Sequence, residues 1–127
     1  MKSFTVQTSK RSEFINITHQ VQSAVKAMGI EDGVITVFVP HTTAGITINE
    51  NADPDVVSDI LRALDRLVPW NGDYEHTEGN AAAHVKASLI GSSVRVIVRS
   101  GELQLGTWQG IFFCEFDGPR LRHVWVK

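Results

Sequence analysis

Residues 111–126 read IFFCEFDGPRLRHVWV, and this stretch decides the fold class of the chain. The apolar run Ile111–Phe116 is typical of a buried β-strand. Asp117-Gly118-Pro119 is a turn signal, and Leu121–Val126 follows as a second strand whose odd-numbered residues share one face. Two such strands joined by a short turn predict that the C-terminal third of the chain is β-structure.

Strand patterns also occur in the rest of the chain, and they are Phe4–Gln7, Val34–Val39, Gly45–Ile48 and Val94–Arg99. The run Val34–Val39 is apolar almost throughout, which favours a central strand. In Val94–Arg99 every second residue is a valine, as in a strand with one face toward a core. The chain therefore has strands in its N-terminal, middle and C-terminal parts.

Three helices are predicted between these strands. One spans Ile17–Met28, with Thr18 as its N-cap and Gly29 at its end. A second begins at Asp53-Pro54, a capping carboxylate before a proline at the first helical position. The apolar stripe expected to be buried on this second helix consists of Val56, Val57, Ile60, Leu61, Leu64 and Leu67. The third helix is the alanine-rich run Asn80–Leu89.

Strands at both ends of the chain with helices inserted between them predict an α+β fold. We expect a mainly antiparallel β-sandwich core with two to three short helices. At 127 residues the chain is long enough for one hydrophobic core and too short for two. A single domain over residues 1–127 is therefore expected.

Composition and charge exclude several functional classes. The formal net charge is −2, so no basic face is expected and no nucleic-acid partner is predicted. No apolar run has the length of a membrane span, and residues 1–5 lack the apolar core of a signal peptide. The single cysteine, Cys114, lies in an apolar strand and is expected to be a core residue in a reducing compartment. We therefore expect a cytoplasmic protein with no membrane partner.

Residues 41–53, HTTAGITINENAD, hold a high density of ligand-type side chains directly after an apolar strand. An imidazole and two carboxylates in one segment suit general acid–base catalysis or a divalent metal. The candidate residues in this segment are His41, Thr42, Thr43, Glu50, Asn51 and Asp53. The alternative is structural: Asp53 is then only a helix cap, and His41 only a strand-end residue.

A second polar segment, Asp73–His84, contributes His76, Asn80 and His84. The two histidines lack the i, i+4 spacing of a helical zinc pair and no cysteine is near, so the signature of structural zinc is absent. An open metal site of two or three imidazoles and a carboxylate remains a hypothesis, as does direct proton transfer. The alternative is that the carboxylates of this segment are solvated loop charges. Lys86 follows His84 on the short helix and is a candidate ligand for an anion.

A third cluster consists of Arg99-Ser100-Gly101 and Gly106-Thr107-Trp108-Gln109. Small residues let backbone N–H groups approach an anion, and the arginine and threonine would add a charge and a hydroxyl donor. The cluster is therefore a candidate phosphate site. The structural alternative is that it holds only a bulge glycine and a core tryptophan.

Several of these motifs, in this order and spacing, resemble the YjbQ-like family. They are His41-Thr42-Thr43-Ala44-Gly45, Glu50-Asn51-Ala52-Asp53-Pro54, EGNAAAHVK at 78–86, Gly106-Thr107-Trp108-Gln109 and Phe116-Asp117-Gly118-Pro119-Arg120. The resemblance covers essentially the whole chain, and the motifs are specific in combination. It implies an α+β domain with a β-sandwich core, usually assembled as a homotrimer.

The resemblance also implies a function, because members of the family are described as a secondary thiamine phosphate synthase. This weak activity couples a pyrimidine methyl diphosphate to a thiazole phosphate and releases diphosphate. The residues expected to be catalytic are His41, Glu50 and His84. Substrate or phosphate binding is expected of Thr43, Asn51, Asn80, Lys86, Arg99, Gly106, Thr107, Trp108, Gln109 and Arg120. A divalent metal, Mg²⁺ or Zn²⁺, would bind among His41, Asp53, His76 and His84.

Two other functions would use the same residues. One is a metal-dependent phosphatase or hydrolase built on the histidines. The other is a trimeric binding module that holds a phosphorylated metabolite or a metal without turnover. In a homotrimer, clusters that are far apart in one chain would meet across a subunit interface.

Overall fold

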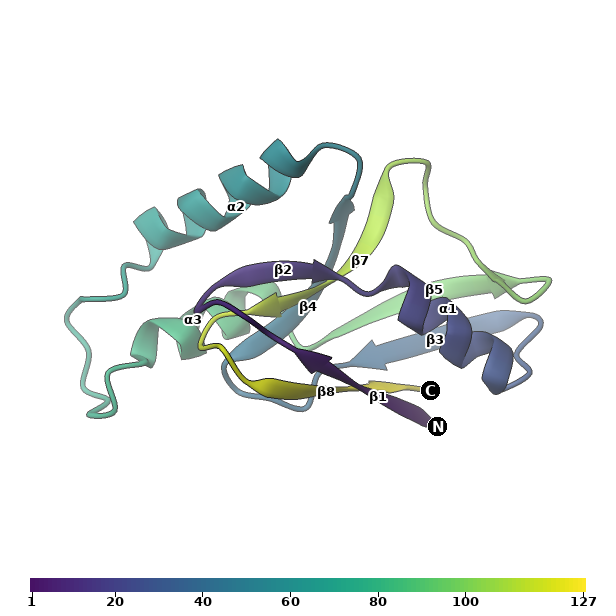
Figure 1. Ribbon diagram of the computed structural model, residues 1–127, viewed down its shortest axis with the longest axis horizontal. Coiled ribbons are helices and arrows are strands. Elements are labelled where there is room, and N and C mark those ends of the chain that lie inside the picture. The colour runs from purple at the N-terminus through teal and green to yellow at the C-terminus, as the bar shows by residue number, and fades with distance from the viewer.

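The computed structural model describes every residue from Met1 to Lys127 and contains two antiparallel sheets and three helices (Figure 1). The larger sheet consists, in spatial order, of β1 (Lys2–Gln7), β8 (Leu121–Val126), β3 (Gly33–Phe38), β5 (Ser93–Arg99) and β6 (Glu102–Leu103). The smaller sheet consists of β2 (Glu13–Asn16), β7 (Gln109–Glu115) and β4 (Ala44–Glu50). The predicted α+β fold with a mainly antiparallel sheet core is confirmed.

The two strands of residues 111–126, β7 and β8, lie in different sheets. β7 pairs with β2 and β4, whereas β8 pairs with β1 and β3. The corner between them therefore carries the chain from one sheet to the other. This corner requires glycine at Gly118, because a Cβ there would lie 2.2 Å from the carbonyl oxygen of Lys10. The Gly118 N–H donates to the carbonyl oxygen of Arg11 (3.0 Å), which fixes the corner against the β1–β2 loop.

The main core lies between the two sheets and is closed on one side by α1 (Thr18–Ala27). Val21, Ala24 and Val25 of α1 are buried in it, as the helical pattern predicted. The expected cap is wrong, because Ile17 occupies the N-cap position and Thr18 starts the helix. The Thr18 hydroxyl instead accepts from the Ile111 N–H (2.9 Å), so it joins α1 to β7.

The helix α2 (Pro54–Leu67) begins as predicted, since the Asp53 carboxylate accepts a hydrogen bond from the Asp55 N–H (2.9 Å). The prediction of a fully buried stripe is wrong. Only Leu64 is buried, and Leu67 is 75 % exposed. Leu64 packs in a second hydrophobic cluster with Ala83 and Ala87 of α3 and Phe112 and Cys114 of β7, and Val57 and Ile60 lie against it, half-buried. Leu67 is not part of this cluster. None of the three helices combines the length and apolarity needed to cross a membrane.

The helix α3 (Ala81–Ile90) packs along β4, and this contact positions the candidate site. A Cβ at Gly45 of β4 would lie 2.6 Å from the carbonyl oxygen of Gly91, so only glycine allows the approach. The Ile46 N–H donates to the same carbonyl (3.0 Å). The close packing brings the first turns of α3, which carry His84, beside the loop that carries His41.

Candidate functional site

A polar pocket of about 470 Å³ lies between the β3–β4 loop, the start of α3 and the corner between β7 and β8. Its walls carry no large apolar side chain. They present three imidazoles, two guanidinium groups and two carboxylates, from His41, His76, His84, Arg120, Arg122, Glu78 and Asp117. We call this cavity the histidine pocket. Its lining suits a small, highly charged ligand.

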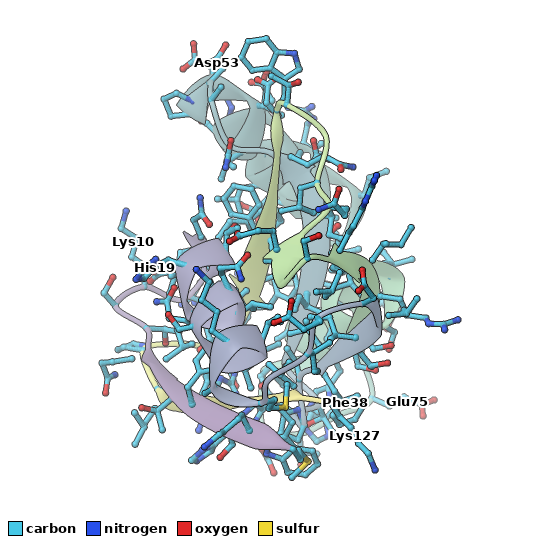
Figure 2. All side chains as sticks on the ribbon, turned by 90° about the vertical axis from the view of Figure 1, so that its right-hand side faces the viewer. Lys10, His19, Phe38, Asp53, Glu75 and Lys127 are labelled. Carbon is cyan, nitrogen blue, oxygen red and sulfur yellow. The ribbon has the colours of Figure 1, made fainter.

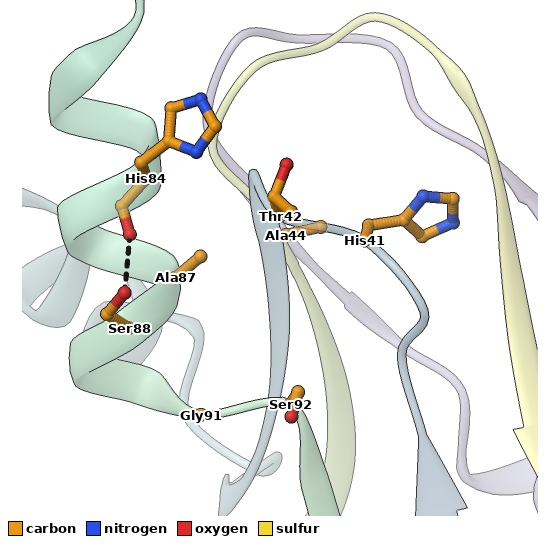
Figure 3. Close-up of a pocket in the computed structure, with 8 residues that line it drawn as sticks. All are labelled: His41, Thr42, Ala44, His84, Ala87, Ser88, Gly91 and Ser92. Carbon is orange, nitrogen blue, oxygen red and sulfur yellow. Dashed lines mark hydrogen bonds between the residues drawn. The ribbon is translucent and has the colours of Figure 1, made fainter.

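A second hollow of about 490 Å³ adjoins the histidine pocket and shares His41, Thr42 and His84 with it (Figure 3). In Figure 3, His84 projects from α3 beside Thr42, and the His41 ring lies beyond Thr42 and points away from α3. The two rings therefore stand on the boundary between the hollows. A ligand longer than a phosphate group can extend from one hollow into the other.

The histidines form two pairs. The rings of His76 and His84 meet edge to face, with centroids 5.3 Å apart and planes at 81°. The rings of His41 and His123 are stacked at 6.0 Å. Glu78 lies near the first pair, with 3.9 Å between its Oε2 and His76 Nε2. No group of three histidine, cysteine or carboxylate side chains is arranged as metal ligands in this structure.

The hydrogen bond at His41 fixes the tautomer of its ring. Nε2 accepts the backbone N–H of His123 (2.8 Å), so the proton of the neutral ring is on Nδ1. Burial lowers the pKa of His41 below its ordinary value of 6.5, and the positive charge of Arg122 lowers it further. Near pH 7 the ring is therefore neutral, and its Nδ1–H is a donor.

We expect this lowered pKa to make folding stability depend on pH. Above pH 6.5 the ring is neutral in both folded and unfolded chains. Below it the unfolded chain binds the proton first, so the free energy of unfolding falls until the pH reaches the lowered pKa. His41→Gln keeps an acceptor for the His123 N–H but does not titrate. Urea titrations near pH 7.5 and pH 5 should show that the free energy of unfolding decreases less between these pH values in H41Q than in the parent. An equal decrease would contradict a lowered pKa of His41 in the folded chain.

A buried ion pair that the sequence reasoning missed supplies Arg122 to the lining of the histidine pocket. The Arg122 guanidinium donates to both carboxylate oxygens of Glu115, and Glu115 is fully buried. Arg122 Nη2 also donates to Thr43 Oγ1 (2.8 Å). The predicted site residue Thr43 is thus held in place by Arg122.

Two sequence signals could have revealed this pair. Glu115 is the only charged residue in the apolar run 111–116. Arg122 shares its strand face with Val124 and Val126, which are buried in the core. A charge at an inward strand position is expected to have a buried partner.

Asp117 was not predicted as a site residue, but it holds two other residues of the histidine pocket in place. Its Oδ2 accepts from Asn80 Nδ2 (2.9 Å) and from Arg120 Nη2 (2.9 Å). The Asp117 carbonyl oxygen accepts from Arg120 Nε (2.8 Å). These bonds orient the Arg120 guanidinium and leave its Nη1 free for a ligand. Asn80 and Arg120, both predicted as ligand-binding residues, are therefore brought together through Asp117.

The structure does not bring all the predicted site residues together. Glu50 lies at the far end of β4 from His41, and six steps along a strand separate the two ends by about 20 Å. In Figure 2, Asp53 lies at the top of the molecule and Glu75 lies in its lower part. Glu50 and Asp53 therefore cannot act on the same ligand as His41 within one chain.

The residues at the far end of β4 form a second group. Glu50 pairs with Gln109 across the β4–β7 ladder, and the Asn51 N–H donates to the Trp108 carbonyl oxygen (2.8 Å). Gln109 Oε1 accepts from the Gly106 N–H (2.8 Å), which closes the turn before β7. We call this set the β4-end group; its members are Glu50, Asn51, Asp53, Gly106, Thr107, Trp108 and Gln109. Trp108 is 62 % exposed, so the structural alternative that places it in the core is wrong.

Two predicted residues lie outside both groups. Arg99 is exposed at the end of β5 and pairs in register with Glu102. Lys86 is two residues after His84 on α3, so its side chain leaves the helix on a different face and forms an ion pair with Asp65 of α2.

The fold and the pocket define a small α+β protein with a histidine- and arginine-lined ligand site. The chain matches the family model described as "UPF0047 protein YjbQ-like" over residues 2–127. It therefore belongs to the YjbQ-like (UPF0047) family.

Relatives of known sequence and structure support this membership. UPF0047 protein YugU of Bacillus subtilis is 53% identical over 128 residues, which cover 100% of this chain and 97% of that protein. UPF0047 protein MJ1081 of Methanocaldococcus jannaschii is 52% identical, over 98% and 90% of the two chains. A crystal structure of an uncharacterized conserved protein of the same family from Clostridium acetobutylicum has a TM-score of 0.98 and 58% identity, covering 100% and 98%.

Proposed function

We propose that this protein is a cytoplasmic enzyme that acts on a phosphorylated small molecule in the histidine pocket, in a reaction of the thiamine phosphate synthase type. The observation that carries the proposal is the lining of that pocket, where three imidazoles and two guanidinium groups face one cavity. Guanidinium groups suit phosphate oxygens, and imidazoles supply or accept protons near neutral pH. The resemblance to the synthase motifs supports the choice of reaction.

In the proposed reaction, the bond between the pyrimidine methyl carbon and the diphosphate oxygen breaks, and its electron pair stays on the diphosphate. The thiazole nitrogen then donates its lone pair to the methyl carbon and forms the new C–N bond. Arg120 and Arg122 would stabilise the negative charge that develops on the leaving diphosphate. His84 would donate a proton to that diphosphate, and the His41 Nδ1–H would donate a hydrogen bond.

A metal would assist the same step by neutralising the diphosphate. His76 and His84 would hold it, and Glu78 is the nearest carboxylate to this pair. The remaining ligands would be phosphate oxygens, water or a group of another subunit. A metal-dependent phosphatase using this histidine pair is the second candidate function.

We also propose that the protein acts as a homotrimer in which the β4-end group of one subunit completes the histidine pocket of the next. Two observations support this. Glu50 lies about 20 Å of strand away from His41 in the same chain. The apolar stripe of α2 is only partly covered by its own chain, and Leu67 is 75 % exposed. A second subunit seated against α2 would bury that surface.

The proposal is tested by incubating the purified protein with the two phosphorylated precursors and measuring thiamine phosphate, with and without a chelator. Release of phosphate from a simple phosphate ester is measured in parallel. Formation of thiamine phosphate is expected. Ester hydrolysis that the chelator abolishes, without synthase product, would favour the phosphatase. Thermal stabilisation by a precursor with no product in either assay would overturn both and leave a binding module.

A further inference from the structure

A second charged pocket lies on the other side of α3 from the histidine pocket. It has a volume of about 500 Å³ and is lined by Arg11, Ser12, Asp65, Trp70, Asn71 and Lys86, with Pro69 at its edge. The residues come from three separate parts of the fold: the β1–β2 loop, the end of α2 with the turn after it, and the middle of α3. We call it the lysine pocket.

Lys86 is the fixed charge of this pocket. Its side chain is 2 % exposed although it ends in an ammonium group, and its partner is the carboxylate of Asp65. That carboxylate is 63 % exposed, so water solvates it well while the lysine is buried in the wall. The two partners therefore differ in what they lose when the ion pair breaks. Asp65 can turn toward solvent at little cost, whereas the buried ammonium group of Lys86 would be left without a partner.

Arg11 supplies a second positive charge at the same cavity. Its guanidinium carbon lies 4.2 Å from the centroid of the Trp70 ring, so one face of the group is stacked on the indole. Stacking uses the face of a guanidinium and leaves its N–H edge available for hydrogen bonds. Ser12 and Asn71 add a hydroxyl and an amide donor to the lining.

We propose that the lysine pocket binds the phosphate group of a small molecule, at a site separate from the histidine pocket. Two cations face one carboxylate in the lining, so the cavity has a net positive charge that a phosphate dianion would neutralise. The phosphate replaces Asp65 as the partner of Lys86 and meets the N–H edge of Arg11. The hydroxyl and amide donors satisfy its other oxygens. Lys86 thus binds phosphate on a different face of α3 from His84, and the chain carries two phosphate sites.

The test is a titration of ¹⁵N-labelled protein with inorganic phosphate at constant ionic strength, following the indole N–H signal of Trp70 by NMR. The signal is assigned with Trp70→Phe. A saturable shift is expected in the parent protein. Lys86→Met should weaken the apparent affinity by about tenfold or more, because it removes the buried charge. Arg11→Gln should also weaken the apparent affinity for phosphate. Because Arg11 lies on an exposed loop, this variant should still fold.

His84→Ala is the matched control, because it empties the histidine pocket of one imidazole and leaves the lysine pocket intact. The Trp70 shift should saturate in this variant as it does in the parent. Loss of the shift in H84A would place the phosphate in the histidine pocket and overturn the proposal. A linear, non-saturating shift, or an affinity unchanged in both K86M and R11Q, would overturn it as well. None of these results depends on whether the protein makes thiamine phosphate.

Discussion

Replacing Arg122 by methionine is expected to lower the free energy of unfolding by about 3–5 kcal/mol, which is the cost of leaving one member of a buried ion pair without its partner. Glu115 is fully buried and accepts hydrogen bonds from Arg122, from the Thr8 hydroxyl (2.8 Å) and from the Phe116 N–H (3.1 Å). In R122M the carboxylate keeps the neutral donors but loses the guanidinium. The measurement is a denaturant titration of the parent and the variant.

Two further variants make this prediction specific. Arg95→Met removes an exposed arginine from β5, and it should change stability by only about 0.5 kcal/mol or less. The double variant Glu115→Leu with Arg122→Met removes both charges, so it should be more stable than R122M alone. A loss in R122M no larger than that in R95M would contradict the view that Glu115 depends on Arg122 as its buried partner.

The second large effect is expected for His84→Ala, which should reduce thiamine phosphate formation by about 10²–10⁴-fold if His84 protonates the departing diphosphate. The His84 side chain lines both hollows of the site and forms no hydrogen bond with the rest of the chain, so the free energy of unfolding should change little. His19→Ala is the matched control, because this exposed histidine lies on α1, outside the histidine pocket. Equal activity in H84A and H19A would rule out a catalytic role for His84.

The same variant tests whether the site is shared between subunits. Glu50→Gln is also expected to lose activity if the β4-end group completes the pocket of a neighbour. Unfolding and refolding H84A and E50Q together would then restore part of the activity, because mixed trimers contain sites with both groups intact. A mixture no more active than the separate variants, from a preparation shown to exchange subunits, would contradict the shared site.

Local signals in the sequence were sufficient for most of the fold. Six of the eight strands were readable from apolar runs and alternation, because a strand presents successive side chains to opposite faces. The two short strands β2 and β6 were not predicted. The start of α2 was readable because Asp53 and Pro54 act on the adjacent backbone. Other failed predictions concern contacts between elements: the hydroxyl of Thr18 bonds to β7, and the stripe of α2 is only partly covered by α3 and β7.

The candidate site, too, was predictable from the sequence only in part. The sequence by itself determined which chemical groups are available and which short segments carry them, because a motif such as 41–45 or 78–86 is contiguous. Only the tertiary structure decided which of these groups face one cavity. β4 is extended and rigid, so it holds Glu50 about 20 Å from the loop of His41. The pairing of β7 and β8 with different sheets brings Glu115 and Arg122 together as a buried pair. These two residues are only seven positions apart, and each is a charge at an inward strand position, so the sequence indicates that each needs a buried partner. The strand pairing of the folded chain decided that they are partners of each other.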